Sequence, residues 1–219
     1  MTQAFSVIGV QHGHCHDMVR QLTGAGAKLV SVYEPDGERA NRLIASYPDA
    51  LAVSDPLEIL DNPDVSVVVL AVLPRERASL AIEVLRAGKH VLFAKPAALS
   101  MKELADVEAA QFASNRLWTV FYSEHFLSEA TRHAVSLCHE GRLGQLRHLI
   151  FSAPHQLKPE TRPEWFFDKA RAGGILADLL THQTQQLLSI TKAKTARLTH
   201  SRIERKDLLQ TRQFEIAGE

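Results

Sequence analysis

Several features that mark specialised protein classes are scarce or missing in this sequence. Two cysteines, Cys15 and Cys138, are too few for the disulfide framework of a small secreted domain, and both fall in expected helices. Lysine plus arginine and aspartate plus glutamate both number 25, so no charge excess points to a nucleic acid or an anionic membrane as partner. The longest apolar runs, such as 65–73, are much shorter than a bilayer span. No basic segment with a cleavable apolar stretch opens the chain, and we expect a cytoplasmic protein.

The residues that are present have the composition of a globular protein. Hydrophobic residues make up 45% of the chain and charged residues 23%, which is ordinary for a soluble fold. A length of 219 residues is enough for one large domain or for two modest domains. We therefore expect the chain to fold around conventional hydrophobic cores.

The first half of the chain alternates apolar runs of strand length with helical patterns. The run 65–72 is nearly all β-branched or leucine, which is typical of a strand buried on both faces of a parallel sheet. Ser100, with Glu103 three residues later, predicts a capping box at the start of a helix. Six strands with helical crossovers predict an α/β fold with a doubly wound parallel sheet. The expected strands are 4–10, 28–33, 51–53, 65–72, 90–93 and 117–121.

From about residue 122 the alternating pattern ends, and the change predicts a boundary between a domain over 1–122 and a smaller α/β domain over 123–219. The elements expected there are helices over 128–139 and 174–190, a long strand over 145–153, and one or two strands after residue 195, separated by a solvated turn at the charged run 202–207. The strand over 145–153 and the tail should pair in one sheet. A bare edge of that sheet needs a cover, so we expect a homo-oligomer or a tail that folds back.

A nucleotide-binding layout occupies the start of the chain. Gly9 ends the first expected strand, a helical pattern follows, and Glu34 ends the second strand. In dinucleotide-binding proteins the helix N-terminus receives the pyrophosphate and the acid binds ribose hydroxyls. Gln11 and His14 occupy the second and third glycine positions of Gly-x-Gly-x-x-Gly, so a loop glycine in an unrelated α/β protein is the alternative. The predicted cofactor-binding residues are Gly9, Gln11, His12, Gly13, His14 and Glu34, with Ala71 near the end of the fourth strand and Pro74 after it.

The segment 12–16 contains three histidines and Cys15, which are side-chain types that bind zinc or copper. Residues this close in sequence cannot all reach one ion if a helix begins among them. No second ligand cluster of matching spacing occurs elsewhere in the sequence. We therefore expect no metal site, and we expect imidazole or amide groups here to replace glycine N–H contacts to phosphate.

Two later motifs carry chemistry. Residues 88–96 read Gly-Lys-His-Val-Leu-Phe-Ala-Lys-Pro, which places Lys95 where a buried strand ends. Residues 173–182 read Gly-Gly-Ile-Leu-Ala-Asp-Leu-Leu-Thr-His, which places Asp178 and His182 four residues apart on one face of an expected helix. A lysine, an aspartate and a histidine over a nucleotide-binding sheet are the groups that alcohol oxidation by hydride transfer needs.

At these motifs the chain resembles the glucose–fructose oxidoreductase / inositol dehydrogenase / rhizopine-catabolism (Gfo/Idh/MocA) family. The resemblance covers nearly the whole chain. It implies an N-terminal NAD-binding Rossmann domain, followed by an α/β domain whose open sheet covers the active site and often makes the oligomer interface. It also implies a nicotinamide cofactor and a secondary hydroxyl of a sugar, polyol or sugar derivative as substrate. Because the charge of Glu34 should repel a 2′-phosphate, we expect NAD rather than NADP.

The resemblance implies roles for individual residues. Lys95 corresponds to the lysine of the family's Glu-Lys-Pro motif, which contacts the substrate hydroxyl and the nicotinamide side, and Pro96 is the motif's proline. His182 would accept the hydroxyl proton, and Asp178 would orient the substrate. Plain structural roles remain the alternative, a strand-end charge for Lys95 and a helix-surface pair for Asp178 and His182. Substrate contacts are also expected, from position or residue type, for Tyr122, His155 and Trp165.

The chain departs from the family pattern at several positions. Ala94 replaces the motif glutamate, and Leu180 and Gln185 stand where members commonly have glycine and an acid. The chain also ends at Glu219, on the order of a hundred residues earlier than the family usually does. These departures keep open a second interpretation, a catalytically silent relative that binds a dinucleotide as a sensor or interaction protein. A metal-dependent hydrolase or lyase that uses 12–16 is a third.

Overall fold

The computed structural model describes residues 3–156, 158–206 and 209–218. The described residues fall into two compact units. One lies within Met1–Phe121 and Phe167–Asp178, and the other lies within Tyr122–Phe166 and Leu179–Glu219. Among the described residues, no helix combines the length and the apolar character needed to cross a bilayer.

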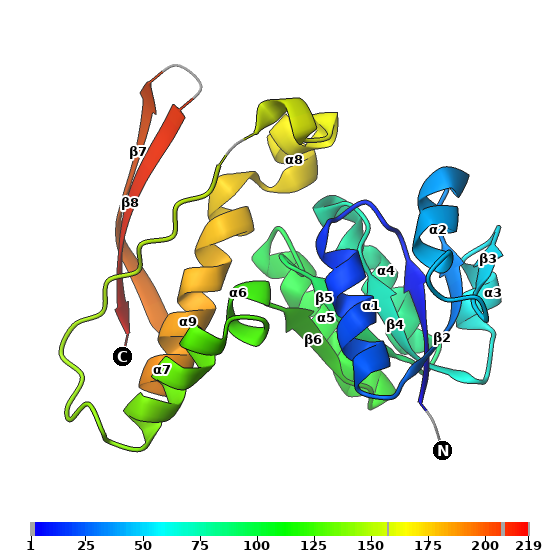
Figure 1. Ribbon diagram of the computed structural model, residues 1–219, viewed down its shortest axis with the longest axis horizontal. Helices are drawn as coiled ribbons and strands as arrows, with labels where there is room; N and C mark the ends of the chain where they lie inside the picture. The colour runs from blue at the N-terminus through cyan, green and yellow to red at the C-terminus, as the bar shows by residue number, and fades with distance from the viewer. Residues whose placement is uncertain (1–2, 157, 207–208, 219) are drawn as a thin grey trace. The chain divides into compact units, whose positions relative to one another are not determined.

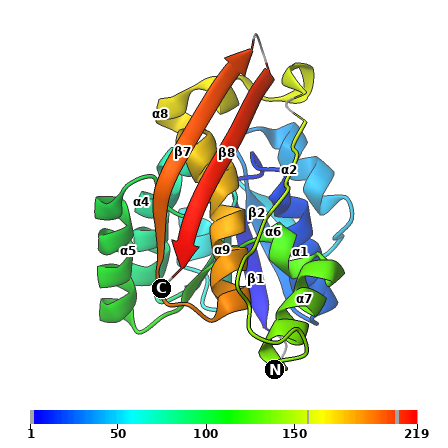
Figure 2. The same cartoon turned by 90° about the vertical axis from the view of Figure 1, so that its left-hand side faces the viewer.

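A parallel six-stranded sheet forms the centre of the first unit, with strand order β3-β2-β1-β4-β5-β6 (Figure 1). The order reverses direction between β1 and β4. Because crossovers are right-handed, α1 and α2 cover one face of the sheet, and α4 and α5 cover the other (Figure 2). The strands are β1 (Ala4–Ile8), β2 (Lys28–Tyr33), β3 (Leu51–Val53), β4 (Val65–Leu70), β5 (His90–Ala94) and β6 (Trp118–Phe121). The helices are α1 (His14–Gly24), α2 (Gly37–Ile44), α3 (Leu57–Leu60), α4 (Pro74–Arg86), α5 (Met101–Ser114) and α8 (Lys169–Ala172).

This architecture confirms the predicted doubly wound fold. Three consecutive residues of β4, Val68, Val69 and Leu70, have no exposed surface, as expected of a strand covered on both faces. The predicted capping box of α5 is present, since Ser100 Oγ accepts the Glu103 N–H at 3.1 Å and Glu103 Oε2 accepts the Ser100 N–H at 3.1 Å. The predicted bounds of β2 and β3 agree with the structure.

The second unit consists of helices and a long antiparallel hairpin. Strands β7 (Ala196–Lys206) and β8 (Leu209–Gly218) pair with each other, and β8 contacts α9 (Figure 2). The remaining elements of this unit are α6 (Ser123–Phe126), α7 (Glu129–His139), α9 (Thr181–Thr191) and the 3₁₀ turns η1 (Pro159–Thr161) and η2 (Glu164–Phe167), the last residue of which belongs to the first unit. The π-helical segment η3 (Leu176–Leu180) begins in the first unit and ends in the second. The helix predicted over 174–190 is thus a π-helical segment that runs directly into α9.

The long strand predicted over 145–153 is absent from the structure, and its predicted pairing with the tail is therefore wrong. Leu146, Leu149 and Phe151 are half-buried, whereas Ile150 is 83% exposed, so burial alternates only over 149–151 and no ladder accompanies it. A strand needs a neighbour for its N–H and C=O groups, and within the described residues β7 and β8 satisfy only each other.

The charged run 202–207 was expected to be a solvated turn, and that expectation is also wrong for its described part. Residues 202–206 continue β7 and pair with 209–213 of β8. The pairing with β8 supplies a partner for the backbone at each of these positions, and this outweighs the low strand propensity of a charged sequence. Residue 207, the last of the run, lies outside the described residues.

Candidate functional site

The loop between β1 and α1 passes very close to the end of β4. Gly9 has a φ of +80°, and its N–H donates to Tyr33 O at 2.8 Å. A Cβ at Gly9 would lie 2.4 Å from Val72 Cγ1 and 2.8 Å from Val72 N. Only glycine can adopt this φ and lie this close to Val72, which explains why the first position of the fingerprint is glycine.

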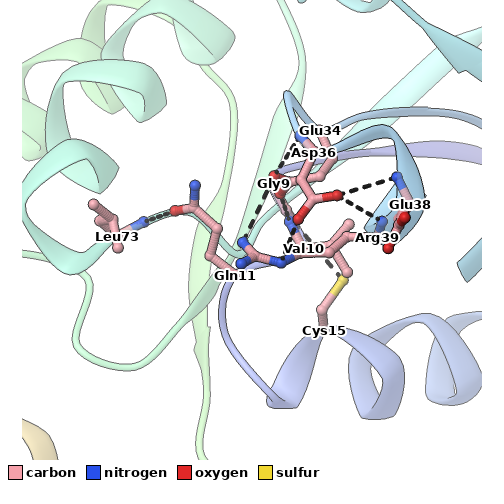
Figure 3. A network of polar contacts seen from close by, with 9 residues as sticks. All are labelled: Gly9, Val10, Gln11, Cys15, Glu34, Asp36, Glu38, Arg39 and Leu73. Carbon is pink, nitrogen blue, oxygen red and sulfur yellow. Dashed lines mark hydrogen bonds and ion pairs between the residues drawn. The ribbon is translucent and has the colours of Figure 1, made fainter. Parts of the chain in front are cut away.

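Gln11, at the second glycine position of the fingerprint, and His12 connect this loop to the end of β4. Gln11 Oε1 accepts the Leu73 N–H at 3.1 Å (Figure 3), and His12 N–H donates to Ala71 O at 3.0 Å. The His14 N–H donates to His12 Nδ1 at 3.2 Å. A Cβ at Gly13, the residue before α1, would meet no atom within 4 Å, so space is open beside the first turn of the helix. The loop is thus preformed by side-chain contacts in place of the second and third glycines.

Glu34 follows β2 directly, and its side chain is only 1% exposed. Val10 N–H donates to Glu34 Oε2 at 2.6 Å, and Asp36 N–H donates to Glu34 Oε1 at 3.2 Å. Arg39 pairs with this acidic group, with Nε 3.1 Å from Asp36 Oδ2 and Nη1 3.9 Å from Glu34 Oε1 (Figure 3). The end of β2 therefore carries two carboxylates and one half-exposed guanidinium.

Lys95 follows β5 directly and is 5% exposed. Its Nζ lies 2.5 Å from Asp178 Oδ1 and donates to Asp178 O at 2.7 Å. The Lys95–Pro96 peptide bond is cis. Asp178 belongs to η3, whose chain returns to the first unit after an excursion of more than forty residues through the second. Two of the three predicted catalytic residues thus form a partly buried ion pair at the carboxyl end of the parallel sheet, with side-chain exposures of 6% for Lys95 and 19% for Asp178.

His14, the first residue of α1, lies in the electrostatic neighbourhood of this pair. Burial, and to a smaller extent the positive charge of Lys95, lower the pKa of His14 to about 4. The imidazole makes edge-to-face contacts with the rings of His12, at 4.7 Å between centroids, and Phe121, at 6.1 Å. His14 is therefore neutral at neutral pH. Among the described residues, no three His, Cys, Asp or Glu side chains are grouped to hold a metal ion.

Arg77, on the first turn of α4, was not singled out from the sequence. It is completely buried, and its Nε donates to Val72 O at 3.0 Å. Its Nη1 donates to Ala94 O at 2.9 Å and to Pro96 O at 2.8 Å. A signal was available, because Arg77 shares the inward side of α4 with Ala78, Ala81, Val84 and Leu85. A cation on an apolar helix face needs a buried partner.

In the second unit, the rings of Tyr122 and His182 are in edge-to-face contact, with centroids 6.0 Å apart. His182 lies at the start of α9 and is 2% exposed. Burial raises the pKa of the Tyr122 hydroxyl. Two predicted site residues, one substrate-binding and one catalytic, are therefore brought together within this unit.

A second polar group in this unit is centred on Glu124, which sequence reasoning missed. Its Oε1 lies 3.1 Å from His155 Nε2, and its Oε2 accepts a hydrogen bond from Gln183 Nε2 at 2.8 Å. Gln186 Nε2 donates to Glu124 O at 3.3 Å. Trp165, the third predicted substrate residue, packs its ring edge-to-face on Phe166 at 6.2 Å. Glu124 and His155 border an open cavity of about 340 Å³, whose other lining residues are Ser128, Thr131, Ile150, Phe151, Ser152, Ala153 and Gln186.

Comparison with known proteins covers both halves of the chain. A family model described as an oxidoreductase family with an NAD-binding Rossmann fold matches residues 4–122. A model of the GFO/IDH/MocA C-terminal domain matches residues 131–208.

Individual relatives agree with these matches. Inositol 2-dehydrogenase 4 of Saccharopolyspora erythraea is 35% identical over 133 residues, which cover 60% of this chain and 38% of that protein. The 1,5-anhydro-D-fructose reductase of Ensifer adhaerens is 23% identical over 195 residues, which cover 84% of this chain and 56% of that protein. A solved structure from Erwinia carotovora atroseptica SCRI1043, assigned to the oxidoreductases, has a TM-score of 0.88 at 26% identity, covering 100% of this chain and 67% of that one. The chain spans about half the length of the curated relatives it matches.

Proposed function

The chain belongs to the Gfo/Idh/MocA oxidoreductase family, and from that premise we propose that it forms the cofactor-binding and catalytic part of an NAD(H)-dependent oxidoreductase acting on a secondary hydroxyl of a sugar, polyol or sugar derivative. The partly buried Lys95–Asp178 pair at the carboxyl end of β5 is the observation that carries this proposal. In open α/β sheets, ligands bind outside the carboxyl ends of the strands where the strand order reverses, and β1 and β4 meet at that reversal here.

The residues around the β1–α1 loop fit a dinucleotide. Gly9 leaves no room for a Cβ, Gly13 leaves space beside the N-terminus of α1, and Glu34 places a negative charge at the end of β2. These are the features that a pyrophosphate and an adenosine ribose require. When bound, the nicotinamide supplies the hydride chemistry. The residues proposed to hold it are Gly9, Gln11, His12, Gly13, His14, Glu34, Ala71, Pro74, Lys95 and Pro96.

The chain's own residues are proposed to manage the proton and the charge. Lys95 would stabilise the negative charge that develops on the substrate oxygen as the hydroxyl proton leaves, because a positive group placed there acts where charge appears. Asp178 holds the Lys95 ammonium at 2.5 Å and would orient the substrate. His182 would accept the hydroxyl proton, since imidazole titrates near neutral pH. Tyr122, His155 and Trp165 are the proposed substrate contacts.

A second candidate function is a family relative that binds a dinucleotide without turnover. Ala94 favours it, because this fully buried residue stands where the family motif has a glutamate. Gln185, which replaces a commonly acidic residue, favours it as well. The retained Lys95–Asp178 pair argues against it.

One experiment separates the two functions. Purified protein is titrated calorimetrically with NAD and with NADP, and cofactor reduction is then followed with a panel of polyols and sugars. Dinucleotide binding with turnover supports the oxidoreductase, and binding without turnover supports the silent relative. A protein that binds neither NAD nor NADP would contradict both. Lys102→Ala is a suitable control variant, because Lys102 pairs with Asp106 on the exposed side of α5.

A further inference from the structure

Arg77 is the largest of the fully buried side chains, and the proposed function leaves it without a role. Its hydrogen-bond partners are three backbone carbonyls, at Val72, Ala94 and Pro96. Within the described residues, Arg77 forms no ion pair with a carboxylate. A buried guanidinium is expensive to desolvate and is retained only where its hydrogen bonds fix something.

The three carbonyls show what Arg77 fixes. Val72 follows β4, while Ala94 ends β5 and Pro96 comes two residues later. The Ala94 and Pro96 carbonyls lie on either side of Lys95 and accept from the same Arg77 nitrogen. A rotation of the backbone at Lys95 would therefore break at least one of these bonds.

We propose that Arg77 is a positioning residue for Lys95, which clamps the backbone on both sides of that lysine and so keeps its ammonium on Asp178. Ala94, which replaces the motif glutamate, has no polar side chain. Arg77 instead donates a hydrogen bond to the Ala94 carbonyl. The catalytic part of the proposal rests on the proposed function of Lys95. The structural part, that Arg77 holds Lys95 in place, does not.

Lys89 provides a matched control for a purely structural buried cation. It directly precedes β5, as Lys95 directly follows it, and it is 4% exposed. Its Nζ donates to Asn62 O at 2.6 Å and to Val65 O at 2.9 Å. Lys89 and Arg77 thus both bind backbone carbonyls of the same sheet, but only Arg77 does so beside Lys95.

The test measures Lys95 directly, without turnover. The parent protein, Arg77→Met, Arg77→Lys and Lys89→Met are labelled with limiting acetic anhydride, and the acetylation rate of Lys95 is read by mass spectrometry. We expect Lys95 to react about ten-fold faster in Arg77→Met, because it is released from a partly buried ion pair (about 1.4 kcal/mol of lost protection). Arg77→Lys keeps the charge and should show a smaller increase. Lys89→Met should leave the rate at Lys95 unchanged.

A second readout concerns turnover. If the proposed function holds, Arg77→Met should lower kcat about ten-fold with little change in the KM for NAD, whereas Lys89→Met should lower only thermal stability. If the parent shows no turnover but Lys95 reacts faster in Arg77→Met, the proposed function fails and the clamp stands. An unchanged Lys95 rate in folded Arg77→Met, or in folded Arg77→Lys should Arg77→Met not fold, would overturn the proposal. So would an equal increase in Lys89→Met.

Discussion

The two ends of β5 each bury a lysine, and the partners of the two ammonium groups differ. Lys89, before the strand, donates to the carbonyls of Asn62 and Val65. Lys95, after the strand, donates to the carboxylate and carbonyl of Asp178. Burial lowers the pKa of Lys89, and the negative charge of Asp61 opposes this shift. We therefore assign Lys89, which donates to backbone carbonyls, a structural role. We assign Lys95, which is paired with a carboxylate, the role of stabilising a negative charge that develops nearby.

The contrast extends over the whole sheet. The amino end holds Lys89 and the Gly88 turn, whose contacts are internal to the fold. The carboxyl end holds the Gly9 loop, Glu34 and the Lys95–Asp178 pair. Ligands in doubly wound sheets bind at the carboxyl end, so substitutions of one residue type at the two ends should have different consequences.

The largest difference in turnover is expected between substitutions of the two lysines. Lys95→Ala should reduce turnover by about a hundred-fold or more with NAD affinity nearly intact, because the charge that stabilises the substrate oxygen is lost. Lys89→Ala should leave turnover of the folded protein unchanged and reduce only its stability. Steady-state kinetics and isothermal titration of both variants test this. Equal turnover in the two variants would remove the functional distinction between the ends of β5.

The proposed base, His182, belongs to the same test. His182→Ala should also reduce turnover about a hundred-fold, and the double variant with Lys95→Ala should lose less than the product of the two effects, because both act on one hydroxyl. Near-normal turnover of His182→Ala would exclude it as the base.

Two of the positive-φ glycines beside the sheet, Gly9 and Gly88, offer the next contrast in cofactor binding and stability. Gly9→Ala places a Cβ 2.4 Å from Val72 Cγ1, whereas Gly88→Ala meets only Arg116 side-chain atoms at 4.0 Å. We expect Gly9→Ala to weaken NAD binding by about thirty-fold, or about 2 kcal/mol, because the loop must move away from β4. Gly88→Ala should cost about 1 kcal/mol of stability, from its φ alone, and should leave NAD affinity unchanged. Calorimetry with NAD and thermal denaturation measure both effects.

His14 should give the carboxyl end a stability that depends on pH. Its pKa is lowered in the folded state to about 4, so the unfolded chain binds the proton more tightly. Stability is therefore full above the ordinary histidine pKa of 6.5 and is lost as the pH falls from 6.5 towards 4. We expect a loss of about 2 kcal/mol of unfolding free energy between pH 7 and 5, measured by urea denaturation. His14→Gln should remove this loss, with His16→Gln on exposed α1 surface as the control; an unchanged pH profile in His14→Gln would contradict the prediction.

Much of the first unit could be predicted because its pattern is redundant. The β-branched run of β4, the capping box at Ser100 and the alternation of strands with helices all indicate the same doubly wound sheet. The pairing of Lys95 with Asp178 could be predicted only through the family resemblance, since these residues lie 83 positions apart. Arg77 was missed because a charge in the first turn of a helix is usually solvated, although the helical period places it on the same face as Ala81, Val84 and Leu85.

The second unit was predicted less well, because strand pairing depends on partners that local sequence does not name. Leu149 and Phe151 are half-buried with the exposed Ile150 between them, as in a strand, yet the segment has no ladder. The charged residues 202–206 lack that apolar alternation, yet they pair with β8. The polar group at Glu124 was missed because its partners, Gln183 and Gln186, are ordinary helix-surface residues by type.

The smallest effect is expected on the choice between NAD(H) and NADP(H), when acidic residues at the two ends of β2 are substituted. Glu34 follows the strand, and Asp49 pairs with Lys28 at its start, with 3.2 Å between Lys28 Nζ and Asp49 Oδ2. The parent should bind NAD(H) at least about ten-fold more tightly than NADP(H), a difference of about 1.4 kcal/mol, because the Glu34 charge repels a 2′-phosphate. Glu34→Gln should reduce the ratio of NAD(H) to NADP(H) affinity. The half-exposed Arg39 would then be paired only with Asp36 and could pair with a 2′-phosphate. Asp49→Asn should leave the ratio unchanged. Calorimetric titration of the three proteins with both cofactors measures this ratio. Equal affinities of the parent for NAD and NADP would contradict the prediction. They would show that the Glu34 carboxylate, which accepts the Val10 and Asp36 N–H groups, does not select the cofactor.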